Sequence, residues 1–337
     1  MKRLLLILFI FACNSNPTYP WYKGSLEELK GITGSKLIMI DFYTDTWGWC
    51  NRLEADTFLD ENFLSINDQF NSIKVNAGER EGGEIASNYK VHGFPTIIFI
   101  DNQGNEIDRI IGYATPDEYI PMVNDILAGK NTIPAMELEL ESNPNDYTLI
   151  YKLGEKYSDR GESDISEKYY TQFLENAPEK MTEEIIFAKF SLAKSGWDNG
   201  DISGLREFIK DYPESNQCMS AYQMIARFYT TEKDTAMEIA TLLEMTEKFS
   251  ESSSAMNSYA WRMTELKHNL NDALEKAKKG VELADDDSKS MILDTQAEIE
   301  WLLGDIESAI KTINIAIKLN PEDEYYQAQL EKFKLAN

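Results

Sequence analysis

The sequence is poor in the side chains that bind metals or form disulfide networks. It holds three cysteines and two histidines, and neither His92 nor His268 has companions at metal-ligand spacing, so we predict no metal site. Glycine-rich phosphate loops, the G-x-S-x-G elbow and the H-E-x-x-H helix motif are also missing. We therefore expect no bound cofactor and none of the chemistry that these motifs carry.

Basic residues are scarce as well. The chain has 33 lysines and arginines against 58 acidic residues, which gives a formal net charge of −25. This excess would repel a phosphate backbone, so we do not expect nucleic acid as a partner. A solvated surface that favours solubility is the simplest explanation of the acidity, and a specific basic client is the alternative.

The apolar run at the start of the chain is too short to cross a membrane comfortably. Residues 1–3 are basic at two positions, residues 4–12 are apolar, and the chain turns polar directly after Cys13. This order is typical of a signal peptide, and its end resembles the lipobox of bacterial lipoproteins. The resemblance implies acylation of Cys13 and a lipid-anchored protein on the periplasmic or extracytoplasmic side of the bacterial envelope. An ordinary secreted or uncleaved peptide is the alternative.

The length of 337 residues favours two folded units rather than one. Changes in pattern along the chain divide it into five segments. We predict a signal peptide at 1–12, a tether at 13–24, an α/β domain at 25–130, a linker at 131–145 and a helical region at 146–337.

The segment 25–130 alternates between apolar runs and helical patterns. Its run at residues 36–43 has the length of a strand that is buried on both faces. The other predicted strands are 72–76, 96–100 and 106–111, and the predicted helices begin at Ser25, near Cys50, near Gly83 and at Pro116. Strands interleaved with helices and closed by a hairpin indicate an α/β sandwich.

Two motifs in this segment carry a family resemblance. Residues 41–50 read D-F-Y-T-D-T-W-G-W-C, and residues 93–96 read G-F-P-T. Together they resemble thioredoxin-fold proteins, in particular the bacterial branch with the motif W-C-G-W-C-K. The resemblance implies a buried acid at Asp41, a lysine beside it at Lys74 and a cis-proline at Pro95.

The motif departs from this family at the attacking position. Dithiol exchange needs a first cysteine at the helix start, where the helix dipole lowers its pKa, and a second cysteine that resolves the mixed disulfide. The four motif positions here are Trp47, Gly48, Trp49 and Cys50, so only the resolving thiol remains. We predict that this site cannot cycle between a local dithiol and a disulfide.

The remaining thiol has two possible roles. Cys50 either takes part in single-thiol exchange with glutathione or a client, or it is a small buried residue left from an active ancestor. In the second case Asp41 is a buried carboxyl whose ionisation is costly, and Lys74 is its charge partner. We expect Cys218 to fill a core position.

The motif loop also predicts a binding surface. Trp47 and Trp49 form an apolar, partly exposed pair unless one or both pack against the domain. The resemblance implies that the loop of Pro95 pairs with extended peptides by strand-like addition. The Trp47 and Pro95 surface is therefore a candidate contact for protein clients.

The segment 146–337 has no convincing strand and repeats with a period of about 34 to 38 residues. Its small and bulky residues recur at spacings that resemble tetratricopeptide repeats (TPR), which implies about five helix pairs, a terminal helix and a groove for protein clients. A generic helical solenoid without such a groove is the alternative. The residues that carry the resemblance are Leu153, Gly154, Tyr157, Gly161 and Pro178, and again Ala297, Gly304, Ala309, Ile313, Ala316 and Pro321.

The sequence as a whole predicts an α/β thioredoxin-like domain followed by an all-α TPR-type solenoid. We expect the protein to bind protein clients at the envelope membrane, through the TPR array and the motif surface, without dithiol turnover. Single-thiol exchange through Cys50, in redox homeostasis or protein folding, is the alternative function. A purely structural role as an assembly scaffold is a third.

Overall fold

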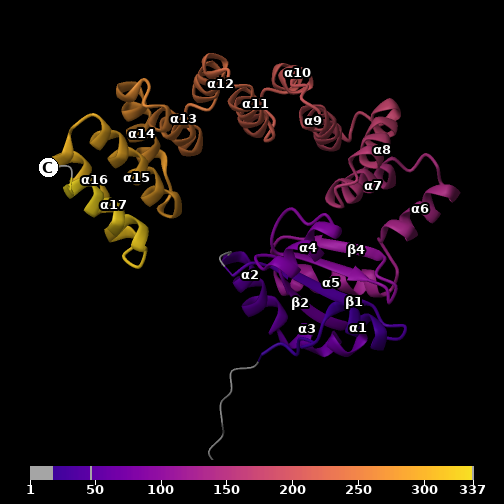
Figure 1. Cartoon of the computed structure of the whole chain (residues 1–337). Coiled ribbons are helices and arrows are strands. Elements are labelled where there is room, and N and C mark those ends of the chain that lie inside the picture. The colour runs from indigo at the N-terminus through magenta and orange to yellow at the C-terminus, as the bar shows by residue number, and fades with distance from the viewer. Residues whose placement is uncertain (1–17, 46–47, 336–337) are drawn as a thin grey trace, which may run out of the picture. The chain divides into compact units, whose positions relative to one another are not determined.

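The computed structural model describes residues 18–45 and 48–335 (Figure 1). The predicted signal peptide, Cys13 and Trp47 lie outside these residues. The chain divides into two compact units, the first ending at Pro178 and the second beginning at Glu179. Among the described helices, none combines the length and the apolar character that spanning a membrane requires.

A four-stranded sheet in the order β2-β1-β3-β4 forms the centre of the first unit. β1 pairs in parallel with β2 and antiparallel with β3, and β3 pairs antiparallel with β4. Each strand lies at, or within two residues of, the range that the sequence predicts for it. The bounds are β1 (Ile38–Tyr43), β2 (Asn71–Asn76), β3 (Thr96–Ile100) and β4 (Glu106–Ile111).

Helices cover both faces of this sheet. Residues of α1 and α4 pack on one face, and residues of α3, α5 and a π-helical turn pack on the other. Both faces of β1 are therefore buried, as its continuous apolar run predicts. The bounds are α1 (Leu26–Ile32), α2 (Gly48–Leu53), the π-helical turn (Glu54–Phe58), α3 (Glu61–Ile66), α4 (Arg80–Asn88) and α5 (Pro116–Leu127).

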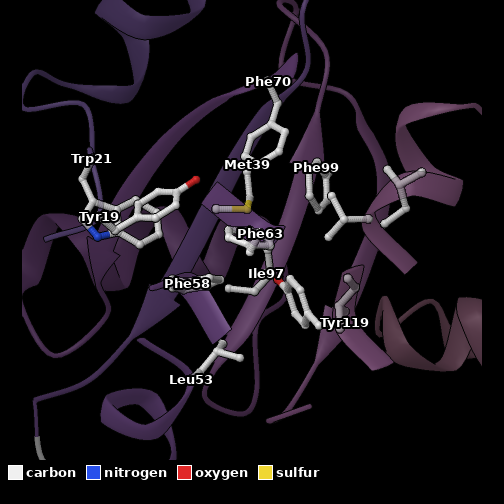
Figure 2. Packing of buried hydrophobic residues seen from close by; sticks show 13 residues of the cluster. Tyr19, Trp21, Met39, Leu53, Phe58, Phe63, Phe70, Ile97, Phe99 and Tyr119 are labelled. Atoms are coloured by element: carbon white, nitrogen blue, oxygen red, sulfur yellow. The ribbon is translucent and has the colours of Figure 1, made fainter. Parts of the chain in front are cut away.

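The residues just before α1 belong to the core. Figure 2 shows Tyr19 and Trp21 beside Phe58 and Phe63, and the ring centres of Trp21 and Phe58 lie 5.3 Å apart. Tyr22 extends the sheet by a parallel bridge to β2. The described part of the predicted tether 13–24 is thus packed rather than free, because its aromatic side chains fill one end of the core.

Three further helices complete the first unit, namely α6 (Ile133–Ser142), α7 (Tyr147–Asp159) and α8 (Ser163–Asn176). The prediction of a linker at 131–145 is wrong for most of its length, because α6 buries Ile133 and Met136 in a cluster with residues of α7. α7 and α8 pack closely at Gly154, where an added Cβ would lie 2.8 Å from ring carbons of Tyr170. The small residue is required by this contact.

Charged side chains join the sheet to α7. Lys156 of α7 pairs with Asp108 of β4, whose side chain is buried. Arg160, at the end of α7, lies 3.2 Å from Glu106 and donates to the backbone carbonyls of Glu106 and Ile107. These bonds satisfy carbonyls of the edge strand β4, which would otherwise be open to pairing with another chain.

The second unit is built from helices that pack in sequential pairs. α9 packs with α10, α11 with α12, α13 with α14 and α15 with α16, and α17 follows on α16. Within the described residues, α7 to α16 therefore form five consecutive pairs. The bounds are α9 (Thr182–Asp198), α10 (Ser203–Asp211), α11 (Cys218–Glu232), α12 (Thr235–Lys248), α13 (Ser253–Leu266), α14 (Leu270–Leu283), α15 (Asp286–Leu302), α16 (Ile306–Leu319) and α17 (Glu324–Leu335).

The contact at Gly154 gives a first prediction. Gly154→Ala should lower the free energy of unfolding by about 1–3 kcal/mol, because the new methyl group overpacks against Tyr170. Gly31→Ala in α1 is the matched control: its Cβ meets nothing within 4 Å, so it should leave stability unchanged or raise it slightly. Denaturant unfolding of the three proteins measures this, and equal stability of Gly154→Ala and the parent chain would contradict the packing described.

Candidate functional site

Asp41 is a buried acid at the centre of the sheet. It pairs in register with Lys74 of β2 on one side and with Ile97 of β3 on the other, and its residue is 3% exposed. Its Oδ2 atom lies 3.8 Å from Nζ of Lys74, while its Oδ1 atom has no hydrogen-bond partner in the described part of the chain. Burial raises the pKa of Asp41 to about 7, and the positive charge of Lys74 opposes that rise.

Lys74 links the buried carboxyl of Asp41 to side chains of neighbouring elements. Its ammonium group forms an ion pair with Glu54 of the π-helical turn and lies between two rings, 4.3 Å from the centre of Tyr43 and 5.5 Å from that of Trp21. Cation–π contact favours this position. Because Glu54 is the nearer carboxylate, Lys74 compensates the charge of Asp41 only in part.

Cys50 is the thiol of the motif and lies in α2. The residue is 7% exposed and forms no disulfide. Burial raises the pKa of the Cys50 thiol above its ordinary value, and the negative charge of Asp41 acts in the same direction, against a backbone hydrogen bond at Thr44. Since the thiolate is the reactive form, this environment disfavours Cys50 as an attacking group at neutral pH.

Trp49 lies on the surface beside Cys50 and is 49% exposed. Its ring centre lies 5.5 Å from that of Tyr113, and the guanidinium group of Arg52 lies over both rings. Arg52 pairs with Asp56 at 3.1 Å, and the hydroxyl of Tyr113 donates to the same carboxylate at 3.0 Å. We call Trp49, Arg52, Asp56 and Tyr113 the aromatic patch. Its members hold one another in place, so Trp49 is ordered and exposed.

The loop of Pro95 adjoins this patch. The peptide bond between Phe94 and Pro95 is cis, as the family resemblance implies. The N–H of Gly112 donates to the carbonyl of Pro95 at 2.8 Å, and Tyr113 is the next residue along the chain. The backbone of the Pro95 loop and the aromatic patch are therefore neighbours.

The structure brings most of the predicted site residues together in two layers. Asp41 and Cys50 are buried, and Lys74 is partly buried beside Asp41, while Trp49 is exposed and the Pro95 loop has an exposed Gly93 and a buried Pro95. Gly48 opens α2, and Trp47 lies outside the described residues. Cys218 is buried as predicted, and its thiol donates to the carbonyl of Tyr212 at 3.2 Å.

Sequence reasoning missed four contributors to this site: Trp21, Glu54, Arg52 and Tyr113. Glu54 follows Cys50 by one helical turn, a spacing that points it to the same side of a helix, so the sequence held a signal for it. Nothing local marks Trp21. No group of three or more metal-binding side chains occurs among the described residues.

The raised pKa of Asp41 gives a second prediction. Between the ordinary value of 3.8 and about 7, the folded state keeps a proton on Asp41 that the unfolded state releases. The contribution of this group to stability is therefore complete below pH 3.8 and is lost as pH rises, by roughly 1.4 kcal/mol per pH unit within the window. Asp41→Asn should remove this dependence of stability on pH. Asp68→Asn, which changes an exposed carboxylate, should leave it unchanged. Denaturant titrations at several pH values test this, and identical slopes for Asp41→Asn and the parent chain would refute it.

Comparison with known proteins places a family on the first part of the chain. The sequence model of the thioredoxin-like domain matches residues 25–127. HCF164, a chloroplastic thioredoxin-like protein of Arabidopsis thaliana, is 26% identical over 111 residues, which are 33% of this chain and 42% of that protein. The thiol:disulfide interchange protein DsbD of Yersinia pestis is 32% identical over 104 residues, which are 29% of this chain and 18% of that protein. The chain thus matches less than half the length of these relatives.

Among solved structures, YrrB, described as a TPR protein with an unusual peptide-binding site, is 13% identical to this chain. The similarity covers 58% of this chain and 96% of that one, with a TM-score of 0.40. The family match at residues 25–127, together with the helix pairs that follow it, confirms the predicted fold class. The chain carries an α/β thioredoxin-like domain, followed by an all-α TPR-type array.

Proposed function

We propose that this chain is a membrane-tethered protein of the bacterial envelope that binds protein clients without dithiol turnover. One observation carries the proposal. Trp47 stands where thioredoxin-type chemistry needs its attacking thiol, and the thiol that remains, Cys50, is buried with a raised pKa. A tryptophan side chain cannot form a disulfide, so the domain has kept a client-binding face and lost the local electron carrier.

The aromatic patch supports binding. The patch combines a half-exposed tryptophan, a partly buried tyrosine and an arginine, and these residue types dominate binding energy at protein interfaces. The patch adjoins the Pro95 loop, and the resemblance to thioredoxin-fold proteins implies that this loop pairs with an extended client by strand-like addition. A client segment that pairs with this loop would pass over Trp49 and Tyr113.

The proposed lipid at Cys13 would hold the domain close to the membrane. Only five residues lie between Cys13 and Tyr19, which is already in the core. The six Cα-to-Cα steps from Cys13 to Tyr19 span at most about 22 Å even when fully extended. The thioredoxin-like domain would then work within that distance of the lipid surface, on the periplasmic or extracytoplasmic side.

Single-thiol exchange through Cys50 is a second candidate. It is favoured by the relatives whose names record thiol:disulfide interchange and by Asp41, whose pKa of about 7 suits it to accept or return a proton near the motif. In this reaction the Cys50 thiolate would attack a client disulfide, form a mixed disulfide and release one client thiolate. A second thiol, from glutathione or a partner, would then release Cys50.

Client binding gives a third prediction. Reduced and carboxymethylated α-lactalbumin, which is unfolded and has no thiols, should bind to the full chain and equally well to Cys50→Ser. Trp49→Ala should weaken this binding by about tenfold or more, as expected for a central aromatic contact. Ile32→Ala, which shortens an exposed apolar residue on α1, should have no effect. Loss of binding in Cys50→Ser, or no change in Trp49→Ala, would overturn the proposal.

The missing thiol gives a fourth prediction. The purified chain should show no catalysed reduction of insulin disulfides by dithiothreitol, because no local pair of thiols can carry the electrons. Trp47→Cys restores the C-x-x-C spacing and should form an intramolecular disulfide with Cys50 on oxidation, seen as a mass loss of two hydrogens. The double variant Trp47→Cys with Cys50→Ser should not. Catalysis by the unmodified chain at the rate of the Trp47→Cys variant would contradict the account.

A further inference from the structure

Three exposed apolar side chains from three helices of the second unit line one pocket. Trp261 of α13, Met291 of α15 and Tyr325 of α17 are 39%, 53% and 51% exposed. The pocket they share has a volume of about 370 Å³. Single exposed apolar residues are common on protein surfaces, but a group that converges on one hollow marks a binding site.

The lining of the pocket holds one carboxyl group, Asp294, whose charge is only partly compensated. Burial raises the pKa of Asp294, while the hydrogen bonds that it accepts and the positive charge of Lys332 oppose that rise. Asp294 is 6% exposed and has no lysine or arginine beside it in the lining. Its oxygens accept hydrogen bonds from neutral groups, at 3.1 Å from the amide of Gln329 and at 3.2 Å from the hydroxyl of Tyr325. The nearby cation, Lys332, forms an ion pair with a different carboxylate, Glu298.

One polar atom in the lining of the pocket lacks a hydrogen-bond partner within the part of the chain that the structure describes. The Oδ1 atom of Asn257 is buried and has no hydrogen-bond partner among the described residues. A buried acceptor without a donor is unfavourable, because it has lost its hydration without gaining a hydrogen bond. A ligand that brings an N–H group to this side of the pocket would remove that cost.

We propose that this pocket binds an extended polypeptide segment in which a lysine or arginine stands next to an apolar residue. The apolar side chain packs against Trp261 and Met291, and the cation pairs with Asp294. The rings of Trp261 and Tyr325 add cation–π attraction. Charge decides the class of client, because an acidic segment would meet Asp294 within a chain of net charge −25. The inference rests on the proposed client-binding function and names the kind of client.

The test is calorimetric titration of the full chain with three short peptides. Acetyl-Leu-Lys-Leu-amide should bind, and the peptides with glutamate or norleucine in place of lysine should bind at least about tenfold more weakly. Asp294→Asn should reduce affinity for the lysine peptide by about tenfold or more and abolish its preference over norleucine. Glu275→Gln, which removes an exposed carboxylate from α14 outside the pocket, is the matched control and should bind as the parent chain does.

A second variant separates loss of binding from loss of structure. Met291→Lys changes an exposed residue, so the variant should unfold at the same temperature as the parent chain. It should not bind the lysine peptide, because it places a positive charge in the lining of the pocket. Equal binding of the three peptides, or unchanged affinity in Asp294→Asn and Met291→Lys, would overturn the inference. So would concentration-dependent dimerisation that Met291→Lys abolishes in the absence of peptide binding, because the occupant would then be a second copy.

The outcome also distinguishes this inference from the proposed function. If carboxymethylated α-lactalbumin binds through Trp49 while the affinity for the three peptides does not depend on Asp294, only the inference fails. If the lysine peptide binds at Asp294 while the binding of α-lactalbumin is unchanged by Trp49→Ala, the proposed function of the thioredoxin-like domain fails and the pocket remains.

Discussion

Asp41 and Lys74 face each other across β1 and β2, and the arrangement of the site depends on how this pair is packed. A carboxyl in the middle of a sheet loses its hydration, and a lysine that is shared with Glu54 restores only part of that loss. Lys74 keeps its place because it lies between the rings of Tyr43 and Trp21. The segment before the domain, which supplies Trp21, is therefore part of the site.

This buried layer and the surface above it have different chemistry. Below, burial raises the pKa of the Cys50 thiol and the charge of Asp41 adds to that rise, and the position that would supply an attacking thiol holds Trp47. Above, the ring of Trp49 contacts that of Tyr113, and the neighbouring Gly112 donates to the Pro95 carbonyl; this is the surface proposed to bind clients. Under the proposed function, the loss of one sulfur atom removes local dithiol exchange and leaves client binding. The proposed lipid anchor and the helix array would then hold clients at a membrane.

Much of this structure could be predicted from local pattern. The strands at residues 38–43 and 96–100 lie in apolar runs, and the period of the helical region predicts about five helix pairs, as α7 to α16 form among the described residues. The parts that were missed depend on contacts between distant residues. Trp21 lies in a segment without periodicity and is fixed only by the core it meets. The pocket of Asp294 is built from three helices that are far apart in sequence, and no single segment of the sequence reveals it.

The ionisation of Cys50 tests the central claim most directly, because a binding domain without redox chemistry requires a thiol that stays protonated. The full chain, labelled with ¹³C at the cysteine Cβ, allows the chemical shift of Cys50 to be followed by NMR as pH is raised. The account predicts a midpoint above the ordinary value of 9.0. A midpoint near 7 or below, as in thiols that attack disulfides, would contradict it.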